Sequence, residues 1–163
     1  MIVVPREFVL LVLLATTASS AVGQQATRPR TRAQQLVNET MARHRELSGL
    51  ELALLSDVGC ATVAATAPED IGEKCDADEK GPIRTGHPDI EAPTRADPVY
   101  DITQALHDAA GKLIGAIGMD IPPLKGESRA AVLRRAQAIL AEIEGQIPSK
   151  QALLRPAATS GGR

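Results

Sequence analysis

Segment 99–106 carries the side chains best suited to hold a small ligand. It alternates in the manner of a β-strand, so Asp101 and Thr103 share a polar face opposite an apolar one. The Asp101 carboxylate would pair with a ligand ammonium group, and Arg84 would offer its planar guanidinium to a ligand carboxylate. Tyr100 is a fourth candidate contact, although its place on the apolar face favours the core. The alternative is that Asp101 and Arg84 are ordinary surface charges, paired with each other.

Cys60 and Cys75 are the two cysteines of the chain. An even number of cysteines in an exported protein predicts a disulfide. The bond would close the segment between them and stabilise the fold by roughly 3 kcal/mol in the chain-entropy model. The alternative is two free thiols that lie too far apart to bond.

The remaining polar residues give little indication of a metal site or a catalytic site. Asp76, Asp78 and Glu79 are close enough in sequence to suggest calcium, but the spacing of a calcium-binding loop is missing, and an acidic start to a helix explains them equally well. The histidines do not have zinc-ligand spacing, and no local nucleophile motif is present. We therefore expect no metal, no cofactor, no catalytic residues and no enzyme activity.

Composition narrows the classes of partner. The net charge of −2 is spread along the chain without a basic patch, which argues against nucleic acid. Aromatic residues make up 1% of the sequence and tryptophan is absent, so few rings are available to stack on a base or sugar. The core must therefore consist of aliphatic side chains.

The first 23 residues resemble a secretory signal, with Arg6 before an apolar run and small residues after it. We expect a cleaved signal in 1–23 and a periplasmic or secreted protein, an uncleaved membrane anchor being the alternative. A disordered leader in 24–31, one domain in 32–147 and a flexible tail in 148–163 would follow.

Hydrophobic periodicity predicts the elements that must position these residues. Gly115 and Gly118 mark places in the second hairpin where another group can approach the backbone. We expect an α+β domain with a five-stranded antiparallel sheet, its last helix on one face and a loop lobe on the other. The expected elements are a helix from 32 to about 47, a hairpin over 49–66, a loop over 67–87 with a short helix near 76–84, an edge strand at 88–92, a hairpin over 99–121, and a helix from 127 or 128 to Pro148.

Residues 32–121 resemble single Cache (PDC, PAS-like) extracytoplasmic sensor domains. The resemblance rests on the hairpin GLELALLSDVGCATVAAT, on the following APEDIGEKCDADE, and on ALHDAAGKLIGAIGMDI. It implies that a small molecule sits between the sheet and the lobe. Such domains are usually tethered to a membrane receptor, whereas this chain shows no second span and no kinase, and therefore looks like a free-standing exported copy.

Two functions follow as hypotheses. The first is an exported, non-enzymatic domain that recognises a small polar metabolite such as an amino acid, amine or carboxylate. The second is a protein interaction module with a vestigial pocket, which dimerises or docks to a membrane partner through the last helix or the sheet edge. The resemblance to sensor domains also suggests a homodimer formed through the first helix.

Overall fold

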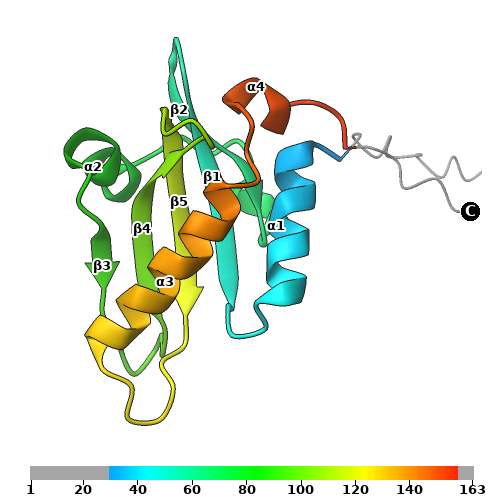
Figure 1. The fold of residues 1–163 in the computed structure, drawn as a ribbon. Coiled ribbons are helices and arrows are strands. Elements are labelled where there is room, and N and C mark those ends of the chain that lie inside the picture. The colour runs from blue at the N-terminus through cyan, green and yellow to red at the C-terminus, as the bar shows by residue number, and fades with distance from the viewer. Residues whose placement is uncertain (1–29, 158–163) are drawn as a thin grey trace, which may run out of the picture.

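The structure is a computed structural model that describes residues 30–157. Within this range the chain forms one five-stranded antiparallel sheet, in the order β2-β1-β5-β4-β3, flanked by helices (Figure 1). The fold class is α+β, as predicted. The expected signal in 1–23, the leader up to residue 29 and residues 158–163 lie outside the described residues. The elements are α1 (Arg32–Arg43), β1 (Gly49–Ser56), β2 (Gly59–Ala65), η1 (Pro68–Asp70), α2 (Ala77–Thr85), β3 (Asp89–Glu91), β4 (Tyr100–His107), β5 (Leu113–Ile121), α3 (Arg129–Glu144) and α4 (Lys150–Leu153).

Two hairpins build the sheet, as the sequence predicts. In the β4–β5 turn, the Asp108 side chain accepts hydrogen bonds from the backbone N–H groups of Ala110 and Lys112, at 3.1 and 3.0 Å. Gly111 in this turn has φ +79°, a conformation that favours glycine. The hairpins join through β1 and β5, where Leu52 lies opposite Ile117. The predicted edge strand is β3, paired with β4.

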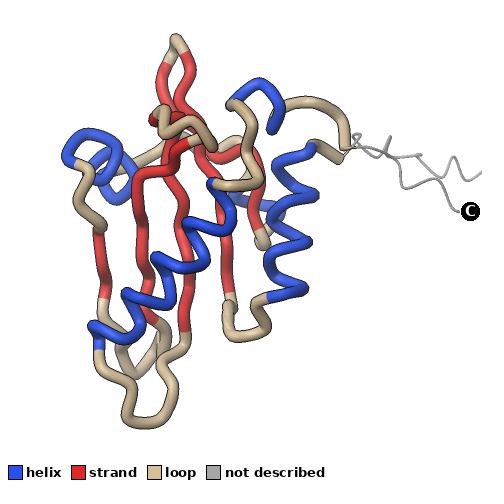
Figure 2. The backbone as a smooth tube through the Cα atoms, in the orientation of Figure 1, coloured by secondary structure: helices blue, strands red, loops and turns tan. Residues whose placement is uncertain are grey.

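Helices α1 and α3 cover one face of the sheet (Figures 1 and 2). Each begins at a hydroxyl cap: the Thr31 side chain accepts a hydrogen bond from the Gln34 N–H, and the Ser128 side chain accepts one from Ala131. The apolar stripes of both helices pack on the strands as one aliphatic core. Its fully buried members include Leu36, Val37, Leu52, Ile102, Leu106, Ile117, Met119, Ile121, Val132, Ala136 and Ile143.

The first helix is shorter than its periodicity suggests. It ends at Arg43, and His44 leaves helical geometry with φ −103° and ψ 75°. The His44 ring contacts Glu142 of α3 at 2.8 Å and Glu46 at 3.1 Å. Leu47 is still buried, at 6% exposure, but it reaches the core from the turn that leads into β1. Periodic apolar residues therefore continued past the end of the helix.

The segment expected to be a flexible tail is folded as far as residue 157. Ser149 caps α4, and Leu153 in this helix is 1% exposed. The backbone N–H of Arg32 donates to the carbonyl of Arg155 at 2.8 Å, and Thr31 pairs with Pro156. The predicted boundaries are wrong here, because one buried leucine and this backbone pairing hold both the end of the leader and the start of the tail.

The lobe covers the other face of the sheet and consists of η1, α2 and the chain between them. Before α2, the chain runs along the free edge of β2: the Thr62 N–H donates to Glu73 and the Gly72 N–H donates to Thr62, both at 2.9 Å. The predicted disulfide joins Cys60 to Cys75, with the Cα atoms 5.3 Å apart. The lobe is thus fixed to the sheet at β2 before α2 extends over β4 and β5.

Candidate functional site

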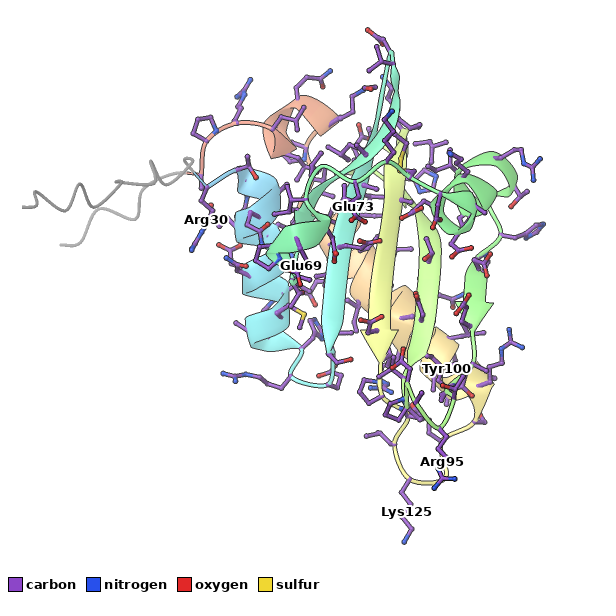
Figure 3. All side chains as sticks on the ribbon, turned by 180° about the vertical axis from the view of Figure 1, so that it is seen from behind. Arg30, Glu69, Glu73, Arg95, Tyr100 and Lys125 are labelled. Atoms are coloured by element: carbon purple, nitrogen blue, oxygen red, sulfur yellow. A yellow bond between two sulfur atoms is a disulfide. The ribbon has the colours of Figure 1, made fainter. Side chains whose placement is uncertain are left out.

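A cavity of about 370 Å³ lies on the lobe side of the sheet. Figure 3 looks at this face, with α3 behind the strands and η1 in front of them. The floor comes from β1, β4 and β5, and the wall comes from the end of β2 and from η1. The lining residues are Ser48, Gly49, Leu50, Glu51, Ala65, Thr66, Ala67, Asp70, Asp101, Gly118 and Asp120.

Strand register brings the acidic side chains together. Asp101 lies opposite Asp120 on one side and opposite Glu91 on the other, while Thr103 lies opposite both Gly118 and Asp89. Residues directly opposite each other in antiparallel strands project from the same face. Two adjacent rows of polar residues therefore cross the sheet. One row contains Gly49, Asp120, Asp101 and Glu91, and the other contains Glu51, Gly118, Thr103 and Asp89.

Glycines in these rows leave space for the acidic side chains. A Cβ atom on Gly49 would collide with the Asp120 carboxylate, and one on Gly118 would lie 2.9 Å from Cγ of Glu51. Gly118 thus fulfils the expectation of a close approach to the backbone. At Gly115 the approaching group is the backbone of β1 rather than a side chain, because a Cβ there would collide with the Ala53 carbonyl.

The carboxylates of the cavity lack a cationic partner. Burial raises the pKa of Glu51 to about 7, helped by the neighbouring Glu79, Asp70 and Asp101. Burial also raises the pKa of Asp101 to about 6, with a contribution from Asp120, whose own pKa is raised for the same reason. Among residues 30–157, no lysine, arginine or histidine lines the cavity. Negative charge is therefore concentrated here at a cost to the folded state.

A second, much smaller cavity of about 10 Å³ adjoins the first at Asp101. Its lining is again polar and acidic: Asp78, Asp89, Glu91, Asp101 and Thr103. Thr103 is 6% exposed, and its hydroxyl takes part in none of the side-chain hydrogen bonds found in the described part of the chain. The buried side-chain polar atoms without a hydrogen-bond partner in residues 30–157 are Gln104 Nε2 and Arg135 Nε and Nη1, and the Thr103 hydroxyl is not one of them.

The structure brings together two of the four residues proposed as ligand contacts. Asp101 and Thr103 face the lobe, as their alternation predicts. Tyr100 points to the opposite face and packs against the aliphatic core, half-buried. Arg84 is exposed on α2 and lines neither cavity. No ion pair joins Arg84 to Asp101 within residues 30–157.

Sequence reasoning missed Glu51, Asp70 and Asp120 as members of the site. A signal was present in two cases, because Glu51 and Asp120 are single carboxylates inside otherwise apolar strands. A strand of period two places such a residue on the face opposite the core. Asp70 gave no comparable signal, since it lies in the short η1 helix and reaches the cavity through the course of the lobe.

The acidic run after Cys75 has a structural role. The Asp76 carboxylate accepts a hydrogen bond from the Asp78 N–H, and the Glu79 carboxylate accepts one from the Asp76 N–H, both at 2.8 Å. This reciprocal capping box starts α2. Among the described residues no cluster of histidine, cysteine or acidic side chains has an arrangement suited to a metal ion. Nor does any helix there have the length and apolarity needed to cross a membrane.

Comparisons with known proteins allow the fold to be assigned. No protein-family model and no curated protein sequence matches the chain. The Agobacterium tumefaciens repressor BlcR is similar in structure, with a TM-score of 0.50 and 9% identity over 72% of this chain and 68% of that one. The GAF domain of a two-component sensor histidine kinase from Bacillus halodurans also gives a TM-score of 0.50, with 10% identity over 69% of this chain and 91% of that one. The chain therefore has a GAF/PAS-like fold, while membership of the Cache family stays a prediction.

Proposed function

We propose that the chain is a non-enzymatic, sensor-type domain that binds a small organic cation in the lobe-side cavity. The main support for this proposal is a cavity of about 370 Å³ whose lining contains four carboxylates and no basic side chain. The four are Glu51, Asp70, Asp101 and Asp120. This volume lies within the range of about 300–1,000 Å³ typical of small-molecule sites.

Charge and hydrogen-bonding capacity support a cation. Partly buried carboxylates are stabilised by a paired positive charge, and none comes from the lining residues. Ionised carboxylates only accept hydrogen bonds, so the complementary ligand is a donor. The sequence suggested three classes of ligand: amino acids, amines and carboxylates. The acidic lining favours amines among them. The lining also lacks an aromatic ring, which favours a hydrogen-bonding ammonium or guanidinium over a quaternary ammonium group.

The fold and the crosslink support the sensor type and the location. Structures similar to this chain include a repressor and a domain of a sensor histidine kinase, which are regulatory proteins. The disulfide between Cys60 and Cys75 is of the kind that persists in oxidising compartments. Export after cleavage of the 1–23 signal is part of the proposal. Dimerisation through the first helix stays a prediction from the resemblance, and docking to a membrane protein through the last helix or the sheet edge stays the alternative hypothesis from the sequence.

A thermal-shift comparison tests the proposal. The probes are butylamine and putrescine as cations, with butyrate as an anion of the same carbon chain. A ligand that binds only the native state at 100 times its dissociation constant adds about 2.7 kcal/mol. We expect an amine to raise the melting temperature and butyrate to leave it unchanged.

Variants then locate the site. Asp120→Asn removes a cavity carboxylate and is expected to abolish the shift. Asp57→Asn makes the same chemical change at an exposed position in the β1–β2 turn and is expected to keep it. If neither amine shifts the melting temperature of a chain with a native circular dichroism spectrum, or if butyrate does so instead, the proposal is wrong.

A further inference from the structure

We propose that His44 forms a pH-sensitive link between α1 and α3, which is complete when the imidazole ring is protonated and loses one of its two hydrogen bonds when the ring is neutral. The inference concerns the helix-covered side of the sheet and does not depend on a ligand in the lobe-side cavity. It follows from the position of the ring, from the two groups that the ring contacts and from the charges around it.

The position of His44 connects three parts of the chain. The residue is the C-cap of α1, and its backbone N–H donates to the Thr40 carbonyl at 2.8 Å. Nε2 of the ring lies 2.8 Å from Oε2 of Glu142 in α3. Nδ1 lies 3.1 Å from Oε1 of Glu46 in the turn before β1. The side chain is 20% exposed, so both contacts are partly shielded from water.

Both ring nitrogens therefore contact a carboxylate oxygen, and this pair of contacts fits only one protonation state. An ionised carboxylate accepts hydrogen bonds and donates none, while a neutral imidazole has one N–H donor and one nitrogen lone pair. A neutral His44 ring could donate to one of the two glutamates and would place its lone pair against the other. The protonated ring has two N–H donors and satisfies both glutamates.

The surroundings of the ring favour its protonated form. His44 follows the last turn of α1, where the helix dipole stabilises a positive charge. Burial lowers the pKa of His44, but the hydrogen bonds to Glu142 and Glu46 outweigh burial and raise the pKa above its ordinary value of 6.5. Histidine is the side chain that changes charge between about pH 5 and 8, so this link responds to pH in a range in which ionised carboxylates and arginines keep their charges.

Two arginines act on the same glutamates and limit the size of the effect. Nε of Arg43 donates to Oε1 of Glu142 at 2.8 Å, and the positive charge of Arg135 helps to lower the pKa of Glu46. Arginine stays protonated at all relevant pH values. The Arg43–Glu142 ion pair therefore persists when His44 loses its proton, and the link between α1 and α3 is weakened rather than lost.

The direction of the pKa shift sets the direction of the pH effect. A histidine whose pKa is raised by folding contributes stability that is fully present below the unfolded value of about 6.5. This stability is lost as the pH rises through the folded value. We therefore expect the end of α1 to be held more firmly in mildly acidic solution than in mildly alkaline solution.

A titration of the His44 ring by nuclear magnetic resonance on the full chain tests the protonation state directly. We expect the midpoint to lie above 6.5 in the wild type, and Glu142→Gln and Glu46→Gln each to lower it. A wild-type midpoint at or below 6.5 would overturn the proposal, as would a midpoint that neither variant changes.

Urea denaturation at pH 5.5 and pH 8.5 tests the link itself. His44→Gln removes the titrating ring, and it should raise the equilibrium constant of unfolding about threefold more at pH 5.5 than at pH 8.5. His87→Gln makes the same change at an exposed residue that has no ion pair within residues 30–157, and it should show no such difference. Groups common to all variants, Glu51 included, cancel in this ratio. If His44→Gln has the same effect at both pH values, the link is not pH-sensitive and the proposal is wrong.

Discussion

The sheet face beneath α1 and α3 differs sharply from the face beneath α2, although the two alternate residue by residue along the same strands. In β5, Ile117, Met119 and Ile121 point to the helices and are at most 1% exposed. Between them, Gly118 and Asp120 point to the lobe and line the cavity. One face gains free energy by burying apolar surface, and the other holds carboxylates at raised pKa.

This contrast shows how a small domain can separate folding from recognition. A strand of period two lets neighbouring residues serve different purposes, because their side chains never meet. Apolar burial on the aliphatic face stabilises the fold and offsets the destabilisation caused by the carboxylates on the acidic face. Substitutions on the two faces should therefore have effects of opposite sign.

The largest effect is expected for Leu52→Ala on the helix-covered face. Leu52 is fully buried, and removing its branched end leaves a cavity as well as a loss of apolar contact. The free energy of unfolding should fall by about 3 kcal/mol, measured by urea denaturation. The adjacent Glu51→Gln change on the other face should not lower stability at neutral pH. Equal losses from both variants would contradict the division between the faces.

The second largest loss of stability is expected from removal of the disulfide that links the lobe to the sheet. The double variant Cys60→Ser/Cys75→Ser removes the bond that closes a loop with a sequence separation of 15. The expected loss is roughly 3 kcal/mol or somewhat less, again by urea denaturation. The wild-type chain in reductant is the control, and it should move toward the variant. If the lobe is held mainly by its backbone hydrogen bonds to β2, the loss will be much smaller.

The carboxylates of the acidic face should make the stability of the fold depend on pH. The Glu51 pKa rises from its ordinary 4.5 to about 7, so between these values the folded chain binds more protons than the unfolded chain. Stability contributed by this group is therefore present below about pH 4.5 and is lost as the pH rises to about 7. Glu79 on α2, Asp70 on η1 and Asp101 on β4 face Glu51 and act in the same direction.

Glu51→Gln removes this dependence at one position. At pH 8 the variant should be more stable than the wild type by about 1 kcal/mol, once solvent screening of a half-buried group is allowed for. At pH 4 the difference should vanish, and melting temperatures at the two pH values measure it. Amine affinity of the wild type should rise between pH 5 and pH 8, since the ionised carboxylates bind the cation. A variant less stable than the wild type at pH 8 would show that Glu51 has a cationic partner.

The smallest effect on stability is expected at Gly118. A Cβ atom there would lie 2.9 Å from both Cγ and Oε1 of Glu51, and the long glutamate side chain can turn aside. Gly118→Ala should change the free energy of unfolding by less than about 1 kcal/mol. Amine affinity should fall by about tenfold, because the methyl group displaces one carboxylate of the site. Unaltered amine affinity would separate Gly118 from the binding surface.

Sequence periodicity predicted the sheet because alternation and turn chemistry are local properties. The Asp108 turn, both hairpins and the lobe-facing position of Asp101 and Thr103 all follow from residues near one another in the chain. Arg84 could not be placed in this way, since the path of the lobe decides where α2 directs its side chains. The same holds for Asp70 and for the buried Leu153, whose surroundings come from distant segments. The acidic character of the site also depends on register between strands, which no single strand reveals.

Backbone pairing between Thr31 and Pro156 places the two ends of the folded domain side by side. A short linker between them would join the ends without crossing the sheet, and new ends could be opened at the exposed turn after Asp57. The same geometry governs a mechanical load. Tension applied through the two ends would open this pairing one hydrogen bond at a time, well before the force reached the strands that carry the carboxylates.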